Sequence, residues 1–398
     1  MKAARGGCRN PGATYVAAME TTSKPRVWLD IDLQALRANF DTIAAKVRPL
    51  SVMVVLKANA YGLGIQRIAE VLRNAGAAMI GVAELREALP ILHLKIPVQI
   101  LGGLIAEEIP AVVAHGIVVT ITNLDTARLL SDEAMRRGVV VPCHLLIDTG
   151  MGRLGILERD AIPVAEAISD LPGLACIGIF THFPHAYADI AGSNAQVRQF
   201  IALVATLEQR GITYDCVHIA NSDGINNIGI ASVEPFTMVR TGINLYGIFD
   251  TEGMRALDLR PVLTLKTRLI SVRKLTAGSS IGYGRTCLLE RDSVVGTVAV
   301  GYADGLPLAM SNNGSLIVRG QQCPVLGRVS MDYTTVSLDT VPGAAVGDEV
   351  TCLRDGTDVG TWAGYKDTNP YEVICSIGNR VERCYVDDNP TDPRVGSL

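Results

Sequence analysis

Between residues 50 and 250 the chain alternates short apolar runs with amphipathic stretches. The apolar runs are rich in β-branched residues and lack a period of two, so they predict strands buried on both faces, as in a parallel sheet. The intervening stretches, such as IQRIAEVLRNAG, carry apolar residues at helical spacing and predict amphipathic helices. The predicted strands cover residues 51–58, 78–83, 97–103, 118–122, 142–149, 174–183, 215–221 and 237–248.

Eight strand–helix units in roughly 200 residues favour an α/β fold of the (β/α)8, TIM-like barrel type. A doubly wound open sheet is the alternative, but it would carry a glycine-rich fingerprint after its first strand, and KANAYGLG at 57–64 is not GxGxxG. A strand and a helix within residues 26–47 precede the barrel. We therefore predict a barrel domain, including this strand and helix, over residues 26–258.

The pattern changes after residue 258 to short strands separated by Gly and Asp turns, such as SVVGTVAVGYADG. This pattern predicts a C-terminal all-β domain over residues 259–390. Residues 1–25 lack the apolar core of a signal peptide and are predicted to be a mobile extension. No apolar run approaches the roughly 18 residues that span a bilayer, so we expect a cytoplasmic protein with no membrane partner.

Charge and cysteine content exclude several functions. Lys plus Arg number 36 and Asp plus Glu 40, giving a formal charge of −4. This balance argues against a nucleic-acid partner, which would favour a basic excess. The nine cysteines show no CxxC spacing and the six histidines no HExxH, so we expect reduced thiols and no metal site. A small-molecule substrate remains the expectation.

Polar residues recur where the predicted barrel strands end, and barrels of this type carry their sites at that edge. The sharpest case is Lys57, which follows an apolar strand. A lysine held against apolar walls loses hydration, which lowers its pKa, and its neutral amine can form a Schiff base with an aldehyde. The alternative is an ordinary strand-end lysine that extends into solvent.

A second group of candidates lies near the last two barrel strands. Backbone amides at Gly242 can approach an anion closely, and Ser222 can add a hydroxyl, although Gly242 also fits a simple turn. A lysine on the first strand and a phosphate site near the last two suit pyridoxal 5′-phosphate (PLP). Arg240, if it faces the pyridine nitrogen rather than forming a surface ion pair, would donate a hydrogen bond without protonating the ring. The ring would then be a weak electron sink, which favours returning a proton to the same carbon.

Two further residues have both a functional and a structural interpretation. His182, in FTHFPH, could stack on a ring or link hydrogen bonds, or it could be a core histidine. Tyr283 lies between two glycines in SIGYGRT. It could act as an acid or base if its pKa were lowered, or it could be an aromatic residue of a hairpin.

Nine motifs together resemble those of the fold-type III PLP-dependent alanine racemases. In chain order they are VLKANAYGLG, IDTGMGRLG, THF, HIANSDG, VRTGINLYG, IGYGRT, VGYADG, GRVSMD and YEVICSIGNRV. The resemblance extends over residues 26–386. It implies a PLP-binding barrel followed by a β domain, and a homodimer whose active sites are shared between subunits. The implied activity is the interconversion of L- and D-alanine, which supplies D-alanine for peptidoglycan.

The resemblance also assigns roles to residues. Lys57 is similar to the lysine that bonds the cofactor and acts as base on the D-enantiomer, and Tyr283, from the other subunit, to the base for the L-enantiomer. Arg153 is similar to an arginine that binds the substrate carboxylate. Met331 and Asp332 resemble partner-subunit residues at that carboxylate and the site entrance. The implied cofactor-binding residues are Lys57, Tyr61, His182, Ser222, Arg240, Gly242, Ile243 and Tyr371, of which His182 would link Tyr283 to Arg240.

The sequence departs from the family pattern at three places. Leu146 stands where many members carry a carbamylated lysine, Leu306 and Leu308 replace a frequent aromatic residue and arginine, and FPHAYAD after His182 differs from the usual acidic entrance loop. These differences keep a serine or broad-specificity racemase open. A related PLP-dependent decarboxylase and a non-catalytic PLP carrier are further alternatives. Arg240 argues against the decarboxylase, and the β domain with Tyr283 argues against the carrier.

Overall fold

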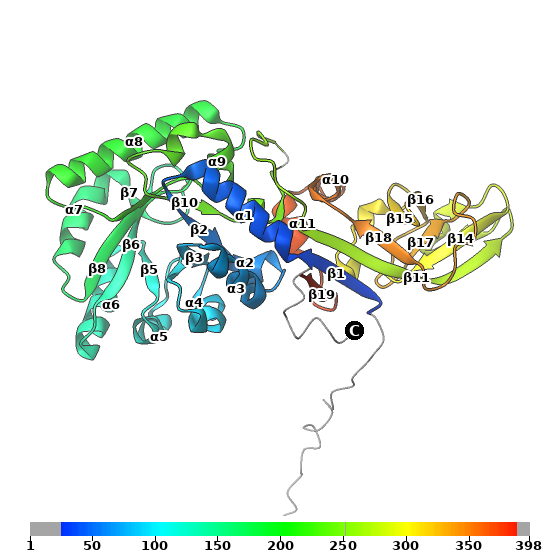
Figure 1. Ribbon diagram of the computed structural model, residues 1–398, viewed down its shortest axis with the longest axis horizontal. Coiled ribbons are helices and arrows are strands. Elements are labelled where there is room, and N and C mark those ends of the chain that lie inside the picture. Colours follow the sequence, from blue (N-terminus) through cyan, green and yellow to red (C-terminus); the bar gives the residue numbers. More distant parts are fainter. Residues whose placement is uncertain (1–24, 251, 388–398) are drawn as a thin grey trace, which may run out of the picture.

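The computed structural model describes residues 25–250 and 252–387. Two bodies lie side by side, a barrel surrounded by helices and an elongated β domain (Figure 1). The extension predicted over residues 1–25 lies, except for Pro25, outside the described residues, as do residues 388–390 of the predicted β domain.

Eight parallel strands form the barrel, in the order β10-β2-β3-β4-β5-β6-β8-β9. They are β2 (Ser51–Val55), β3 (Met79–Val82), β4 (Val98–Ile100), β5 (Val118–Ile121), β6 (Val141–Asp148), β8 (Leu174–Phe180), β9 (Cys216–His218) and β10 (Met238–Thr241), and β7 (Ile156–Leu157) pairs with β6. Every predicted strand is present, and each ends earlier than predicted. The remaining predicted residues leave the sheet and form the loops and short helices that follow it.

Two backbone hydrogen bonds join the first and last strands of the order and nearly close the barrel. The amide of Thr237 donates to the carbonyl of Val217 at 3.0 Å, and the amide of Arg240 to that of Ala220 at 2.9 Å. The helices of this half are α1 (Leu33–Val47), α2 (Lys57–Tyr61), α3 (Ile65–Ala75), α4 (Leu85–Ala88), α5 (Ile109–His115), α6 (Leu124–Arg137), α7 (Glu158–Ser169), α8 (Ile190–Gln209) and α9 (Ser222–Asn227). Four short 3-10 helices complete it: η1 (Leu89–Leu94), η2 (Ala106–Glu108), η3 (Gly229–Ser232) and η4 (Ile243–Tyr246).

The second body is an antiparallel barrel closed by the pairing of β11 with β14. Its elements are β11 (Leu263–Leu275), β12 (Ser280–Ile281), η5 (Tyr283–Arg285), β13 (Cys287–Leu288), β14 (Ser293–Val298), η6 (Tyr302–Asp304), η7 (Leu308–Met310), β15 (Ser315–Val318), β16 (Gln321–Leu326), β17 (Thr334–Ser337), β18 (Glu349–Leu353), α10 (Gly356–Lys366), α11 (Pro370–Cys375) and β19 (Glu382–Val386). These two bodies confirm the predicted fold class, a TIM-like barrel followed by an all-β domain.

The strand before the barrel belongs to the other sheet. β1 (Val27–Asp32) pairs antiparallel with β11 and parallel with β19, although the sequence analysis grouped it with the barrel. Asp32 then caps α1 by accepting a hydrogen bond from the amide of Ala35 at 2.8 Å, and α1 packs against α3 outside the barrel. The first and last strands of the described chain therefore meet where the two bodies join (Figure 1).

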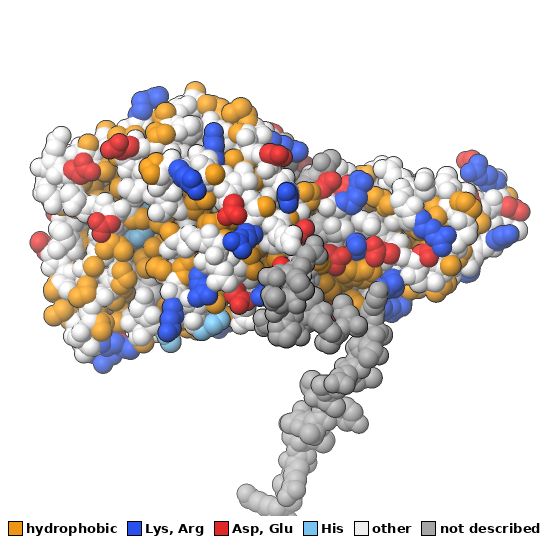
Figure 2. Space-filling view, in the orientation of Figure 1, with side chains coloured by type: hydrophobic (Ala, Val, Ile, Leu, Met, Phe, Trp, Pro, Cys, Tyr) orange, Lys and Arg blue, Asp and Glu red, His pale blue; other side chains and the backbone are white. Residues whose placement is uncertain are grey.

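The surface shows no segregation of charge on the face viewed in Figure 2, where basic and acidic side chains are interspersed. Within the described part of the chain, none of the helices has both the length and the apolar composition that crossing a membrane requires.

Candidate active site

A cavity of about 360 Å³ lies at the carboxyl ends of the barrel strands. Eight of the predicted site residues line it: Lys57, Tyr61, Arg153, His182, Ser222, Arg240, Gly242 and Tyr371. Apolar side chains, among them Leu101, Leu146 and Phe180, complete its walls. A larger hollow of about 680 Å³ on the β domain is lined by Tyr302, Leu306 and Leu308 but by none of the predicted site residues. The chemistry of the candidates therefore assigns the site to the smaller cavity.

Lys57 opens a left-handed turn directly after β2. The four residues Ala58–Tyr61 have φ between +54° and +59°, and none of them is glycine. This conformation costs about 1–2 kcal/mol per residue, so surrounding contacts must hold it. On one side Glu87 does so, because its carboxylate accepts hydrogen bonds from the amides of Ala58 at 2.6 Å and Ala83 at 2.8 Å.

The amine of Lys57 stands in an open cavity, so solvent reaches it. Desolvation by the cavity walls is nevertheless the main factor that lowers the pKa of Lys57, and the positive charge of Arg153 lowers it further. The neutral amine is thereby favoured, which is the form that attacks an aldehyde. A lowered pKa is what the functional interpretation of Lys57 requires.

Gly242 is required by close packing rather than by a special backbone angle. A Cβ atom there would lie 2.1 Å from the hydroxyl oxygen of Tyr61. That ring is fixed between Tyr246 and Tyr371, at centroid distances of 5.6 and 6.0 Å. The amide of Gly242 donates to the hydroxyl of Ser222 at 3.0 Å, so an amide, a hydroxyl and two phenols converge on one wall of the cavity. Such a group of donors suits a phosphate.

Arg240 is a buried cation, only 3% exposed, rather than a member of a surface ion pair. Its guanidinium donates to the carbonyls of Thr181 and Ile219 at 2.9 and 3.0 Å and lies 5.2 Å from the ring centroid of Phe180. Burial lowers the pKa of Arg240 to about 9, which leaves it charged at neutral pH. It can therefore donate a hydrogen bond into the cavity without protonating an acceptor there.

Histidines on both sides of Arg240 accept from it. Its Nη2 lies 3.1 Å from Nδ1 of His182 and its Nη1 2.7 Å from Nδ1 of His218. Because a guanidinium only donates, both Nδ1 atoms accept, and the proton of each neutral imidazole sits on Nε2. Burial, followed by the charge of Arg240, lowers the pKa of His182 to about 3. The predicted link from Arg240 to His182 is thus present, with an N–H left to donate onward.

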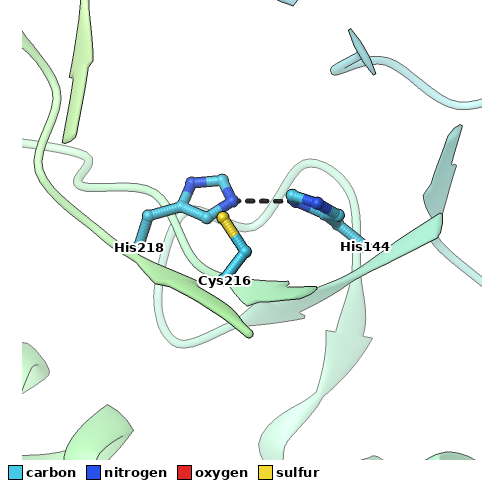
Figure 3. A group of neighbouring side chains, drawn as sticks. All are labelled: His144, Cys216 and His218. Atoms are coloured by element: carbon cyan, nitrogen blue, oxygen red, sulfur yellow. Dashed lines mark hydrogen bonds between the residues drawn. The ribbon is translucent and has the colours of Figure 1, made fainter. Parts of the chain in front are cut away.

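Beneath Arg240 a hydrogen-bonded relay continues into the barrel, which the sequence analysis missed. Nε2 of His218 lies 3.0 Å from Nδ1 of His144, and Cys216 lies beside them (Figure 3). The ligand atoms of these three residues lie within 4.8 Å of one another, a spacing that a metal could also use. The chain of donors starting at Arg240 nevertheless engages Nδ1 of each histidine as an acceptor. Hydrogen bonding therefore accounts for both nitrogens of His218 and for Nδ1 of His144, while Nε2 of His144 is buried without a partner among the described residues. The motif HIANSDG contains His218, but nothing local in the sequence connects it to His144.

The relay predicts acid-sensitive stability. Burial and the charge of Arg240 lower the pKa of His144 to about 4, whereas an unfolded histidine titrates near 6.5. As pH falls from about 6.5 toward 4, the unfolded chain binds a proton at His144 that the folded chain does not, so stability is lost. Between pH 7 and 5 we expect the free energy of urea unfolding to fall about 2 kcal/mol more in the wild type than in His144→Gln. Equal losses in the two proteins would contradict the buried, neutral assignment.

Arg153 reaches the cavity from the loop after β6. Asp148 shapes this loop by accepting hydrogen bonds from the amides of Gly150 at 3.0 Å and Gly152 at 3.1 Å. Within residues 25–250 and 252–387, Arg153 forms neither a hydrogen bond nor an ion pair, and Leu146 contributes only apolar surface to the cavity. The cation is therefore free to meet an anionic group of a ligand.

The remaining predicted residues lie elsewhere. Ile243 is buried at the start of η4, next to Gly242. Tyr283 and Met331 are on the β domain, 73% and 52% exposed, and Asp332 pairs with Arg380 at 2.7 Å. Among the described residues, Tyr371 is the only one from the β domain that lines the cavity. A single chain therefore does not bring Tyr283, Met331 and Asp332 to Lys57.

The cavity residues fit PLP in their chemistry: an amine of lowered pKa, a phosphate-sized group of donors packed too closely for a Cβ at Gly242, and a buried guanidinium. Together with a parallel barrel and a following β domain, they define a PLP-dependent enzyme of the barrel-plus-β-domain class.

Comparison with known proteins identifies the family within this class. The alanine racemase N-terminal domain matches residues 31–250 and the alanine racemase C-terminal domain residues 262–385. Alanine racemase from Desulfosudis oleivorans is 36% identical over 377 residues, covering 90% of this chain and 96% of that one. Alanine racemase from Geobacter sulfurreducens is 36% identical over 388 residues, covering 93% and 98%.

Solved structures agree with these matches. Alanine racemase from Clostridium difficile superposes with a TM-score of 0.86 at 28% identity, covering 92% of this chain and 97% of that one. Alanine racemase from Bartonella henselae, solved with covalently bound pyridoxal phosphate, gives a TM-score of 0.81 at 27% identity, covering 91% and 100%. The chain belongs to the alanine racemase family. The expected family, enzyme class and cofactor, an isomerase that uses PLP, are thereby confirmed.

Proposed function

We propose that this enzyme interconverts L- and D-alanine by moving the Cα proton between two bases, Lys57 and Tyr283 of the partner subunit. The observation that carries this proposal is that Lys57 and Arg240 line one cavity at the carboxyl end of a parallel barrel. When bound there, PLP supplies an electron sink that acidifies the Cα–H bond of an attached amino acid.

Different residues of the cavity would bind the phosphate and the pyridine ring of PLP. Ser222, the amides of Gly242 and Ile243, and Tyr371 would hold the phosphate. Arg240 would donate to the pyridine nitrogen, and its continued charge would keep that nitrogen unprotonated. By leaving that nitrogen unprotonated, Arg240 would favour return of the proton to Cα over other reactions of the bound amino acid. This argues against the decarboxylase alternative.

Inversion at Cα requires proton carriers on opposite faces of the substrate. Lys57 would take or deliver the proton on one face, which its lowered pKa favours. Tyr283 of the partner subunit would serve the other face. The Nε2 proton of His182, left free by its bond to Arg240, would be donated to that phenol and favour its ionised form. Arg153 would bind the substrate carboxylate, with Met331 and Asp332 of the partner subunit beside it.

A shared site requires a homodimer, and the surface of the β domain supports one. Tyr283, Tyr302 and Met331 are 73%, 46% and 52% exposed. The segments of Tyr302 and Met331 are joined by hydrogen bonds from the amide of Tyr302 to the carbonyl of Ser330 and from the amide of Ala303 to that of Met331. Exposed aromatic and apolar side chains on adjoining segments are typical of surfaces that bind another chain.

The small cavity favours alanine over bulkier amino acids, with serine as the second candidate because Leu306 and Leu308 differ from the family pattern. A role in supplying D-alanine for peptidoglycan, in the cytoplasm, follows from this activity as part of the proposal. Alanine racemase from Bacillus anthracis has been solved with bound L-Ala-P, and its structure covers 92% of this chain at a TM-score of 0.81.

Racemisation rates across a panel of L-amino acids test the substrate. We expect kcat/KM for alanine to exceed that for serine and lysine by at least about tenfold, because a small pocket discriminates by shape. Circular dichroism or coupled D-amino-acid oxidation would follow each reaction. A higher value for serine or lysine would replace alanine with a broad-specificity assignment, and release of carbon dioxide from any of them would favour a decarboxylase.

A further inference from the structure

The left-handed turn after Lys57 is held from the C-terminal end of the chain as well as by Glu87. β19 lies beside β1 where the two bodies meet (Figure 1), and its register pairs Leu29 with Arg383 and Ile31 with Tyr385. Arg383 and Tyr385 are two positions apart and so project from the same side of the strand. Both contact the residues that end the turn.

Tyr385 binds the exit of the turn. Its hydroxyl donates to the carbonyl of Leu63 at 2.8 Å. A Cβ atom on Gly64 would lie 1.9 Å from that hydroxyl oxygen, so Gly64 is the residue that admits the phenol. The phenol of Tyr385 therefore packs directly against the backbone of Leu63 and Gly64, at the end of the turn.

Arg383 connects the turn to a second segment of the site. Its Nε donates to the carbonyl of Gly62 at 3.0 Å, and its Nη atoms donate to the carbonyls of Gly378, Val381 and Ile377 at 2.7, 2.6 and 2.9 Å. Ile377 and Gly378 follow α11, the helix that carries Tyr371 of the cavity wall. One guanidinium thus ties the residue after the Lys57 turn to the end of the Tyr371 helix.

All four acceptors of Arg383 are backbone carbonyls, whereas Arg380 nearby in the sequence pairs with the carboxylates of Asp304 and Asp332. A planar guanidinium can serve several carbonyls at fixed angles, which a lysine amine or an apolar side chain cannot do. Loss of the group would remove one hydrogen bond from each of these carbonyls, of which that of Gly378 also accepts from the amide of Val381 at 3.1 Å, and would remove a restraint on a turn that L-residues disfavour.

We propose that Arg383, supported by Tyr385, is a positioning residue that holds the left-handed turn and thereby fixes the direction in which Lys57 enters the cavity. Neither residue lines the cavity, so both act through the turn. The inference rests on the proposed function, because it takes Lys57 as the lysine that bonds PLP. It also gives a role to the pairing of β19 with β1, which places Arg383 and Tyr385 against the turn.

The test compares three variants with the wild type. Arg383→Met removes the guanidinium at similar length, Tyr385→Phe removes one hydroxyl, and Arg268→Met is the matched control. Arg268 also donates to a backbone carbonyl, that of Gly347 at 3.1 Å, but does not contact the turn. The readouts are the rate at which the apo-protein bonds added PLP, followed by absorbance and borohydride trapping, then kcat and KM at saturating PLP, and the thermal midpoint.

For Arg383→Met we expect PLP bonding and kcat to fall about tenfold or more, with KM changed less than about threefold, because misdirection of Lys57 affects its chemistry more than substrate binding. Tyr385→Phe should lose about two- to fivefold in the same two quantities, and Arg268→Met should stay within about twofold. Wild-type rates of PLP bonding in Arg383→Met, with only a lower thermal midpoint, would overturn the proposal by showing a purely structural role.

If Arg383→Met does not fold, Tyr385→Phe decides, since it removes one oxygen atom only, and wild-type behaviour in it would overturn the proposal. Failure of the proposed function gives a different result: the unaltered protein would then bond no PLP or would not racemise alanine. If the unaltered protein bonds no PLP, the positioning role of Arg383 is refuted as well. If it bonds PLP but does not racemise alanine, slower PLP bonding by Arg383→Met would still support the positioning role.

Discussion

Lys57→Ala is expected to abolish racemisation, with kcat reduced by at least about 10⁴-fold. The variant loses both the amine that bonds the cofactor and one of the two proton carriers. Its free amine is favoured in the wild type by desolvation and by the charge of Arg153, and alanine offers no substitute. The wild type should also show an absorbance band near roughly 420 nm that borohydride removes, and the variant should lack it.

Lys46→Ala is the control for this experiment, because Lys46 is an exposed residue in the last turn of α1 and lies outside the cavity. It should keep both the band and the activity. Retention of the band in Lys57→Ala would transfer cofactor bonding to another lysine and remove the basis of the proposed mechanism. Retention of the activity without the band would show that covalent bonding is dispensable.

Mixing two inactive subunits is expected to restore activity. If each site combines Lys57 of one chain with Tyr283 of the other, a hybrid of Lys57→Ala and Tyr283→Phe subunits contains one site with both bases and one with neither. A purified hybrid dimer should therefore have about half the activity of the wild-type dimer, whereas each variant alone is nearly inactive. Differently tagged, co-expressed subunits would allow the hybrid to be isolated.

The structural reason for this expectation is the separation of the two residues. Tyr283 is 73% exposed on the β domain, and the described residues that line the cavity do not include it. A hybrid no more active than its parents would contradict the shared site, as would a fully active monomer in sedimentation. A Tyr283→Phe homodimer with unchanged activity would remove Tyr283 from the mechanism altogether.

The barrel was predictable because its strands are buried on both faces. Continuous apolar runs such as the one before Lys57 locate such strands, and the change to turn-rich segments after residue 258 locates the β domain. The strand ends were less predictable, since all eight strands stop short of their predicted limits. Where a chain leaves a sheet depends on how its side chains pack around the cavity, which a local pattern does not record.

Pairings between distant segments could not be predicted from the local pattern either, because that pattern does not record which segments pack together. β1 reads as an ordinary strand, but its partners lie more than 200 residues later in β11 and β19. The relay from Arg240 through His218 to His144 joins three barrel strands, β10, β9 and β6, and its two histidines are 74 residues apart. The left-handed backbone of the turn at Ala58–Tyr61 was not predicted, because four consecutive non-glycine residues adopt it only under external restraint.

The sequence by itself determined which strands would be buried, the order of the two bodies and the types of residue at the strand ends, because burial and periodicity act between near neighbours. Only the tertiary structure decided which of those residues meet in the cavity, which proton each histidine carries, and how a C-terminal arginine holds the turn at Lys57. These depend on contacts between segments that are far apart along the chain. Such contacts are fixed by three-dimensional packing and leave no periodic signal in the sequence.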